Sequence, residues 1–350
     1  MPERRPEIGI AAEKRSVDSG SLAPLHIDCE REVPRIAGRL LELVGGEFRR
    51  RGVVVALSGG VDSSVCAALA CKAFGPARVL ALLLPEKESS PQSTELGRQV
   101  AEQFGIPCVA QDITPVLEAI GCYAIRDQAI RSVFPEYGDD WKNKVVIRGG
   151  LNGRVHFFKL VVQAPDGRVL ERRLPYREYL QIVAAQNYKQ RIRKVIEYFH
   201  ADRLHYAVLG TPNRLEYDQG FFVKNGDGSA DVKPIAHLYK TQVYLLARHL
   251  GLPEEICSSK PTTDTYSLEQ GQDEFYFGLP YEKMDLALWA HDHNMPARDL
   301  APLLDINEKH AAFVYNDIRS KRKAARYLHA KPRLVEELDG TPGVASRFPE

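Results

Sequence analysis

The residues best suited to chemistry lie in one short run, Ser58-Gly59-Gly60-Val61-Asp62-Ser63-Ser64, which combines two glycines, three hydroxyl groups and one carboxylate. Glycines let a backbone approach an anion closely, and the N–H groups at the start of a helix favour negative charge. No Lys follows the glycines, so the run is not the G-x-x-x-x-G-K-[ST] phosphate loop. An Asp beside a phosphate is repulsive unless a cation bridges the two, so Asp62 predicts Mg²⁺. The run therefore indicates a site for pyrophosphate and a metal ion.

Elements on both sides must hold this run in place. Residues 53–57 are apolar and rich in β-branched side chains, which is typical of a buried parallel strand, and residues 65–74 follow a helical pattern. The alternation continues with an amphipathic helix at 33–51, strands at 78–84, 107–111 and 206–210, and helices at 94–104 and 188–199. This order predicts an α/β fold with a doubly wound parallel sheet and right-handed crossovers.

A different pattern interrupts the alternation. Strand-like runs at 144–147, 155–162 and 169–174 are separated by Gly- and Pro-containing turns at 149–153 and 165–167. They predict a small antiparallel β-meander inserted at 139–178. Beyond Gly251 the pattern is that of helices joined by Pro-containing loops. We therefore expect a loose N-terminal arm at 1–32, one main domain at 33–330 that contains the insertion, and a C-terminal tail at 331–350.

Composition narrows the range of partners. The 350 residues include 47 Lys and Arg against 46 Asp and Glu, so no global positive field favours nucleic acid, and small molecules are the expected partners. Six cysteines occur without a C-x-x-C pair, which argues against a zinc knuckle or a dithiol redox site. No apolar run approaches the ~20 residues of a membrane span, and the first residues lack the apolar core of a signal peptide. We expect a soluble, cytoplasmic protein with no membrane partner.

The run at 58–64 resembles the pyrophosphate loop of the N-type ATP pyrophosphatases, which include NAD synthetases, GMP synthetases, asparagine synthetases and tRNA thiolation enzymes. Later segments are similar to NAD synthetases in particular, and their order and spacing match over residues 34–135 and 185–290. These segments are 187–193 (NYKQRIR), 209–216 (LGTPNRLE), 220–231 (GFFVKNGDGSAD), 238–243 (LYKTQV), 260–264 (KPTTD) and 278–285 (GLPYEKMD). The resemblance implies the Rossmann-like fold of the adenine nucleotide alpha hydrolases, with a helical C-terminal part.

The resemblance also implies a role for each matching residue. Asp62 and Glu216 would hold Mg²⁺, and Asp227 would lie where ammonia arrives. The catalytic residues would be Asp62, Lys240, Asp227 and Thr262. ATP would be bound by Ala56, Leu57, Ser58, Gly59, Gly60, Val61, Asp62, Ser63, Thr211, Lys240 and Thr262. The acid substrate would be contacted by Arg191, Lys224, Asp231, Ser320 and Lys321.

The implied activity is that of an ammonia-dependent carbon–nitrogen ligase. A carboxylate is a poor acyl donor because its leaving group would be oxide, whereas attack on the α-phosphate of ATP converts that oxygen into AMP, which ammonia can displace. In NAD synthetases the acid is nicotinic acid adenine dinucleotide, and the products are NAD, AMP and pyrophosphate. Glutamine-dependent relatives carry a glutaminase domain ahead of the loop. Few residues precede Ser58, so we expect ammonia itself to be the nitrogen donor.

Two features depart from the family, and both fall on the side of the acid. The interval from Asp112 to Asn187 is longer than usual and holds the predicted meander, and Ser320 stands where the family has a His. The alternative is therefore an amide ligase of the same type that adenylates a different carboxylate in a specialised biosynthetic pathway. A tRNA thiolase would require a catalytic cysteine pair and a basic surface. A non-catalytic nucleotide-binding role is disfavoured because the ATP side is complete.

The resemblance implies a homodimer whose two-fold interface builds the acid site, and we expect the helices around residues 115–135 to lie at that interface. The insertion at 139–178 follows the third predicted strand, and open α/β sheets bind their ligands at the carboxyl ends of parallel strands. Either the insertion borders the acid pocket and alters which acid is accepted, or it decorates the dimer interface. The sequence leaves both readings open.

Overall fold

A four-stranded parallel sheet forms the centre of the chain. The structure is a computed structural model that describes residues 23–148, 157–259, 266–268, 276 and 279–336. The strands are β1 (Val53–Ala56), β2 (Val79–Leu83), β3 (Cys108–Ala110) and β7 (Ala207–Val208), in the order β3-β2-β1-β7. Every neighbouring pair is parallel. The predicted doubly wound α/β fold is confirmed.

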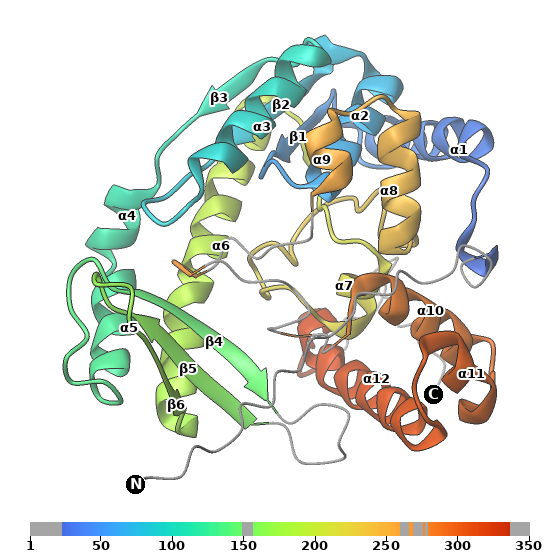
Figure 1. Ribbon diagram of the computed structural model, residues 1–350. Coiled ribbons are helices and arrows are strands. Elements are labelled where there is room, and N and C mark those ends of the chain that lie inside the picture. The colour runs from blue at the N-terminus through green and yellow to red at the C-terminus, as the bar shows by residue number, and fades with distance from the viewer. Residues whose placement is uncertain (1–22, 149–156, 260–265, 269–275, 277–278, 337–350) are drawn as a thin grey trace, which may run out of the picture.

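Helices cover both faces of this sheet (Figure 1). Because successive side chains of a strand point to opposite faces, Val53 and Val55 pack on one side and Val54 on the other. The first side is covered by α1 (Cys29–Leu41), α2 (Val61–Phe74), α3 (Pro91–Gln103) and α8 (Lys240–His249). The second side is covered by α4 (Thr114–Ala119), α5 (Cys122–Arg131) and α6 (Tyr176–Leu204). Burial on both sides explains why β1 is a continuous apolar run rather than an alternating one.

Several helices differ in their bounds from the sequence expectations. α1 begins at Cys29 instead of residue 33, because the Asp28 carboxylate caps it by accepting a hydrogen bond from Arg31 N at 3.3 Å. A short π-helix, η2 (Glu42–Glu47), replaces the end of the predicted 33–51 helix. α2 begins at Val61, directly after Gly60, so Asp62 lies in the first turn of the helix rather than ahead of it. α6 extends beyond the predicted 188–199 in both directions.

The predicted meander is present as a three-stranded antiparallel sheet. It consists of β4 (Lys142–Arg148), β5 (Phe157–Gln163) and β6 (Val169–Arg173), in the order β4-β5-β6. Its inner face carries Leu160 and Val162, which pack with Ile130, Phe134 and Ile182 from the end of α5 and the beginning of α6. The N-terminal half of α6 thus packs on the meander, while the C-terminal half packs on the central sheet.

Helices form the remainder of the described chain. These are η1 (Ala23–Leu25), η3 (Pro76–Arg78), α7 (Arg214–Gln219), α9 (Glu254–Ser258), α10 (Tyr281–Asp292), α11 (Ala297–Leu304) and α12 (Glu308–His329). α10, α11 and α12 enclose their own apolar cluster, which includes Leu286, Leu300, Leu304 and Ile318. The expected helical C-terminal part is confirmed. No helix among the described residues is long and apolar enough to cross a lipid bilayer.

Candidate active site

The Gly-rich turn between β1 and α2 is held in shape by its own hydroxyl groups. Ser58 N donates to Ser63 Oγ at 3.2 Å, and Ser63 Oγ donates to Gly60 O at 3.0 Å. Gly59 has a φ of 78°, and a Cβ atom added there would lie 2.1 Å from Ser93 O. Only glycine fits this position, because both the positive φ and the close approach of α3 exclude a side chain. The turn places the N-terminus of α2, with its N–H groups, beside the large cavity of the domain.

A cavity of about 1390 Å³ lies at the carboxyl ends of the central strands. It is bounded by the turn after β1, the loop after β2, α6, the segments on both sides of α7, and the meander. The predicted site residues that line it are Ala56, Leu57, Ser58, Gly59, Gly60, Val61, Asp62, Ser63, Thr211, Glu216, Asp227 and Lys240. The structure therefore gathers the predicted ATP and metal residues that it describes into one cavity. Thr262 lies outside the described residues.

Asp62 is the centre of a charged cluster in this cavity. The buried Lys240 ammonium, which is 3% exposed, donates to Asp62 Oδ2, and Asn213 Nδ2 donates to Asp62 Oδ1 at 3.2 Å. Burial alone would lower the pKa of Lys240, but the charges of Asp62 and Glu216 outweigh that effect and raise it. Lys240 is therefore held as a cation beside two carboxylates.

Asn213 connects the two carboxylates. It caps α7 by accepting a hydrogen bond from Glu216 N at 3.1 Å, while Glu216 Oε2 accepts from Asn213 N at 3.2 Å. This capping box fixes the backbone of Glu216, and the Asn213 amide fixes Asp62. Sequence reasoning did not assign Asn213 a role, although the Asn-x-x-Glu spacing at 213–216 was a visible signal of a helix N-terminus.

The donor set fits Mg²⁺ better than a metal that is held by protein ligands alone. Mg²⁺ is commonly held by one or two carboxylates together with water and substrate phosphates. Asp62 and Glu216 supply two carboxylates next to the phosphate-binding turn. Within the described part of the chain, no group of three or more His, Cys, Asp or Glu side chains could hold a metal ion. A metal held here would depend on oxygen ligands from a bound nucleotide.

Asp227 lies on another wall of the cavity. Its Oδ1 atom accepts a hydrogen bond from Val223 N at 2.7 Å, and burial raises the pKa of its carboxyl group. Lys194 and Glu197 line the cavity from α6, where Lys194 Nζ donates to Glu197 Oε2 at 2.7 Å. Sequence reasoning missed this pair because Lys194 and Glu197 follow the end of the recognised motif at 187–193.

Arg191, Lys224 and Asp231, three of the predicted acid-binding residues, lie outside the described lining of the cavity. Arg191 Nε donates to Lys224 O at 3.3 Å, and Lys224 Nζ donates to Tyr327 O at 2.8 Å near the end of α12. Asp231 Oδ2 accepts a hydrogen bond from Val208 N at 2.7 Å at the end of β7. Arg193 lines the cavity instead of Arg191, since residues two apart on a helix face opposite sides. An acid-binding role for these three residues stays a prediction.

The two acid-binding residues predicted on α12 also lie outside this lining. Ser320 is exposed. Lys321 Nζ donates to Tyr276 O at 2.6 Å and to Asp317 Oδ2 at 2.7 Å, and burial lowers the pKa of its ammonium group. The role of these two residues in acid binding is also still a prediction.

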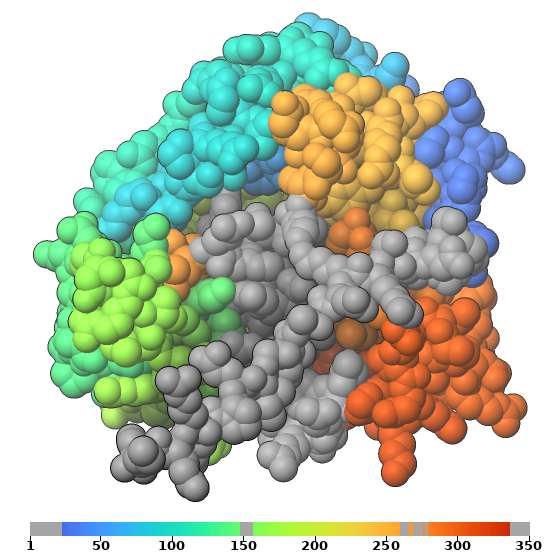
Figure 2. Space-filling model, viewed as in Figure 1, coloured from blue at the N-terminus to red at the C-terminus, as the bar shows by residue number. Residues whose placement is uncertain are grey.

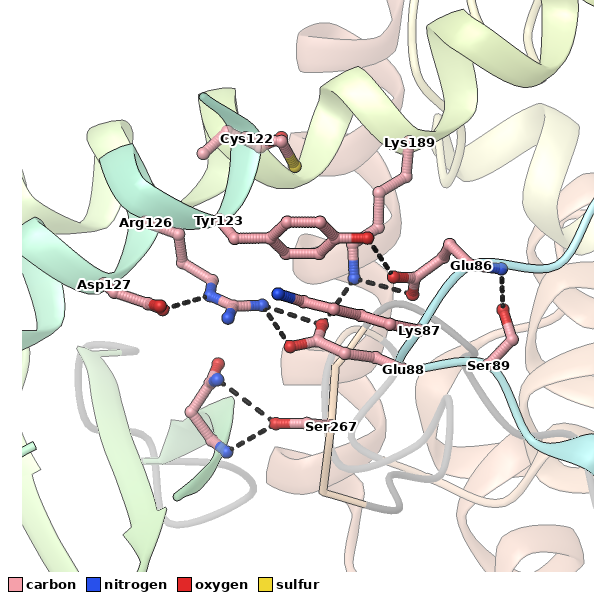
Figure 3. Close-up of polar contacts among 12 residues, drawn as sticks. Glu86, Lys87, Glu88, Ser89, Cys122, Tyr123, Arg126, Asp127, Lys189 and Ser267 are labelled. Atoms are coloured by element: carbon pink, nitrogen blue, oxygen red, sulfur yellow. Dashed lines mark hydrogen bonds and ion pairs between the residues drawn. The ribbon is translucent and has the colours of Figure 1, made fainter. Parts of the chain in front are cut away.

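A buried charge network supports the loop that follows β2, as Figure 3 shows. Lys189 Nζ donates to Glu86 Oε1 at 3.0 Å and to Glu88 Oε2 at 2.6 Å. The Tyr123 hydroxyl donates to Glu86 Oε2 at 2.6 Å, and Arg126 donates to both Glu88 oxygens at 2.6 and 2.7 Å. Burial opposes the ionisation of Glu88, but Lys189 and Arg126 hold the pKa of Glu88 below its usual value. Glu88 lines the cavity, so the network fixes part of its wall.

The meander forms the wall on the opposite side of the cavity from α2 (Figure 1). Lys142 and Ile147 of β4 and Phe158 of β5 contribute to the lining, together with Tyr179 of α6. The Phe158 and Tyr179 rings stack with their centroids 3.9 Å apart. The insertion therefore borders the cavity, and its effect on which acid is accepted stays a prediction.

Solved structures share this fold. The NMN synthetase of Francisella tularensis is 22% identical with a TM-score of 0.58, and the match covers 89% of this chain and 100% of that one. The NH3-dependent NAD synthetase of Campylobacter jejuni is 20% identical with a TM-score of 0.58, over the same shares of the two chains. At these identities the likeness shows the fold.

Curated relatives match much more closely in sequence. The NH(3)-dependent NAD(+) synthetase of Mesorhizobium japonicum is 55% identical over 315 residues, which are 90% of this chain and 99% of the relative. The protein of the same name from Rhizobium meliloti is 54% identical over 90% of this chain and 94% of the relative. The one from Thermotoga maritima is 35% identical over 75% of this chain and 91% of the relative.

The family model described as NAD synthase matches residues 40–134 and 165–326. The gap at 135–164 contains all of β4 and β5, and it overlaps the predicted insertion at 139–178. Most of the meander is therefore an addition to the part that this family shares. The phosphate turn, the Asp62–Lys240 pair and the parallel sheet agree with these matches. The chain therefore belongs to the NAD synthase family.

Proposed function

We propose that this chain is an ammonia-dependent NAD synthetase, an ATP-dependent ligase that adenylates the carboxylate of nicotinic acid adenine dinucleotide and transfers ammonia to it. The products are NAD, AMP and pyrophosphate. One observation carries the proposal: the phosphate turn, the Lys240 cation and the two carboxylates Asp62 and Glu216 converge in one cavity. The relatives that are 54–55% identical over 90% of the chain carry the name of this activity.

Adenylation requires that negative charge be stabilised on the departing pyrophosphate. The N–H groups at the start of α2 and the Lys240 ammonium are the groups that this cavity offers for that purpose. Both are held in place before the reaction, the first by the Ser58–Ser63 hydrogen bonds and the second by its contact with Asp62. Preorganised donors of this kind stabilise a transition state without the cost of reorientation.

Asp62 and Glu216 would hold Mg²⁺, which supplies charge neutralisation to the phosphates when it is bound. Asn213 orients both carboxylates, since its side chain contacts Asp62 and its capping box fixes Glu216. Asn213 is thus a positioning residue for the metal ligands.

Amide formation requires a nucleophilic ammonia molecule, so a proton must leave the ammonium ion. Asp227 is the group we assign to this step. Its carboxylate lies in the cavity wall, and burial raises its pKa, which makes it a better proton acceptor. The Lys194–Glu197 pair beside it provides further charge on the same wall.

We also propose that the chain forms a homodimer and that an exposed face of α6 contributes to the interface, while the expected part of the helices around residues 115–135 stays a prediction. The apolar side chains of α4 and α5 are mostly buried within the chain, among them Leu117, Tyr123 and Ile130. On α6, Val195 is 64% exposed and Phe199 is 62% exposed, one helical turn apart. An apolar pair on an exposed helix face suits an isologous contact. Light scattering of the chain and of Val195→Glu at micromolar concentration tests this, and a wild-type monomer would contradict it.

The proposed activity is tested by incubating the purified chain with ATP, Mg²⁺, ammonium and nicotinic acid adenine dinucleotide. Release of pyrophosphate and stoichiometric formation of NAD are expected. Parallel reactions contain nicotinic acid mononucleotide, free nicotinic acid or other carboxylates. Turnover of one of these acids, with none of the dinucleotide, would overturn the NAD synthetase assignment in favour of an amide ligase with a different acid substrate.

A further inference from the structure

The short segment Tyr266–Leu268 is fastened to the open edge of β4. Asn143 N donates to Ser267 Oγ at 2.9 Å, and Leu268 N donates to Asn143 O at 3.1 Å. Asn143 Nδ2 donates to the same Ser267 oxygen at 3.2 Å. In the sheet order β4-β5-β6, β4 pairs with β5 on its other side, so the segment occupies the edge that β4 would otherwise leave open. We call these contacts the Asn143 clasp.

The clasp sets the position of a cavity wall. Tyr266 is 5% exposed and packs in the same apolar cluster as Phe134 and Leu160, and both Tyr266 and Ser267 line the cavity. In Figure 2 the orange atoms of residues 266–268 lie between the cyan and green surfaces of the neighbouring elements. Asn143 has no exposed surface and is not among the lining residues, so it acts on the cavity only through the segment it holds.

The clasp also reaches the charge network of Figure 3. Asn143 Nδ2 donates to the Tyr137 hydroxyl at 2.9 Å. Burial raises the pKa of Tyr137 to about 12, and the nearby charge of Arg126 opposes part of that rise. Arg126 in turn donates to both Glu88 oxygens. The clasp, which joins the meander to the segment at 266–268, therefore lies within electrostatic reach of the network that supports the loop after β2. Buried polar networks of this kind hold their members in a single arrangement.

The size of the cavity indicates which substrate meets this wall. Pockets for one small ligand commonly have a volume of roughly 300–1,000 Å³, and this cavity of about 1390 Å³ leaves space beyond the nucleotide. The phosphate turn and Lys240 occupy the side of α2, whereas the meander and Tyr266 lie across the cavity from them. Phe158, Tyr179 and Tyr266 make that side aromatic, which suits a planar ring on the acid.

We propose that Asn143 is a positioning residue through which the meander fixes Tyr266 and thereby sets the affinity for the acid substrate, a carboxylic acid on a planar aromatic ring. The inference rests on the proposed function. By this inference the inserted meander holds the residues on the acid side of the cavity in place and takes no part in phosphate binding. Most of the meander lies outside the match to the family model, so this task belongs to the addition rather than to the common part.

The test is a double-mutant cycle with the full-length chain. Asn143→Ala, Ser267→Ala and the double variant are assayed for KM and kcat with the acid that the wild type uses, at saturating ammonium. Ser267→Ala removes the oxygen that accepts from both Asn143 nitrogens and is expected to raise KM for the acid about tenfold. Asn143→Ala keeps the main-chain contacts and removes only the Nδ2 bonds, so its expected rise is about threefold. Both variants should leave KM for ATP within about twofold. The double variant is expected to show the rise of Ser267→Ala, about tenfold, because the Nδ2 bond that Asn143→Ala removes ends on the same Ser267 oxygen. Ser267→Thr keeps the hydroxyl group and should keep the wild-type KM for the acid.

Two controls separate this positioning role from a general loss of structure. Arg168→Ala changes a side chain that is 64% exposed in the β5–β6 turn of the same meander, and it should leave both constants unchanged. Circular dichroism and thermal unfolding of every variant measure the fraction that is folded. The inference is overturned by unchanged KM for the acid in folded single variants, by additive effects in the double variant, or by equal rises in KM for ATP. Wild-type chain that turns over no aromatic acid would overturn the proposed function instead.

Discussion

The turn after β1 and the meander are two walls of one cavity, yet they are built in opposite ways. The turn is a contiguous run whose backbone is shaped by its own Ser58 and Ser63 hydroxyls and by Gly59. The meander wall depends on the hydrogen bond that Asn143 donates to Ser267, a residue 124 positions away. The first wall can bind phosphate with main-chain groups, so its binding function can be predicted from a short stretch of sequence. The second wall uses side chains from distant segments, and its chemistry appears only when the chain is folded.

The largest effect should come from the charged cluster on the turn side. Asp62→Asn removes one of the proposed metal ligands and is expected to lower the rate of pyrophosphate release by about 10³-fold. Asn is preferred to Ala because its side-chain oxygen can still accept a hydrogen bond from the buried Lys240 and its size is the same. Ala would remove the partner of Lys240 and leave a cavity, and both changes destabilise the fold. Pyrophosphate release is measured with saturating ATP, and Asp299→Asn, the same carboxylate-to-amide change at an exposed position on α11, is the control. Near-normal turnover in Asp62→Asn would remove this residue from the mechanism.

Substitutions at two glycines test whether phosphate binding depends on the backbone shape of the turn. In Gly59→Ala the new Cβ would meet Ser93 O at 2.1 Å, so we expect a loss of ATP affinity of at least about 100-fold. Gly167→Ala is a matched control, since Gly167 has a similar positive φ of 86° but nothing within 4 Å of the added atom. It should cost about 1–2 kcal/mol of stability and no ATP affinity. Equal ATP affinities in the two variants would show that the close approach of α3 is unimportant.

The buried carboxyl group of Asp285, which contacts the residue after Lys240, should affect how the stability of the fold depends on pH. Asp285, which accepts hydrogen bonds from Thr241 N and Oγ1 at 2.7 Å, has its pKa raised by burial to about 7. Between about pH 4 and 7 the folded state therefore holds a proton that the unfolded state has lost, so this group makes stability fall as pH rises. Asp285→Asn should reduce that slope by up to about 1.4 kcal/mol per pH unit. Urea unfolding at several pH values measures it, with the exposed Asp299→Asn as control; identical slopes would contradict the burial argument.

The smallest effect is expected at the rim of the meander wall. Lys142 is exposed and lines the cavity, so Lys142→Ala should raise KM for the acid about threefold and leave KM for ATP unchanged. Lys159→Ala is the matched control, because Lys159 belongs to the same sheet but pairs with Glu171 and does not line the cavity. A larger rise in KM for the control than for Lys142→Ala would place the acid elsewhere.

Local pattern predicted the kinds of elements better than their ends. The parallel sheet and the meander follow from apolar runs and turn residues, and both are confirmed. α6 was underestimated because its apolar residues do not keep to one face: Ile182 packs toward the meander, whereas Ile192 and Ile196 pack toward the central sheet. α1 was placed too late because its apolar spacing starts at Val33, while Asp28 is the actual cap.

Within the site, the residues assigned to ATP and those assigned to the acid fared differently. The described ATP residues line the cavity, but Arg191 and Lys224 contact other parts of the chain. A motif shows which residues occur together, but not which side of a helix each one occupies. Arg193, two positions from Arg191, is the one that lines the cavity. The Glu88–Arg126–Lys189 network was not anticipated either, because its members come from three separate elements.

The sequence by itself determined the phosphate turn, because a strand end, two glycines and a helix start are local features whose backbone geometry needs no distant partner. It also determined the alternation that produces the parallel sheet. Only the tertiary structure decided that Asp62 would meet Asn213, 151 positions away, and Lys240, 178 positions away. It likewise decided that the meander would hold Tyr266 against the cavity. Contacts across such separations depend on how whole elements pack, and packing is a property of the assembled core rather than of any one segment.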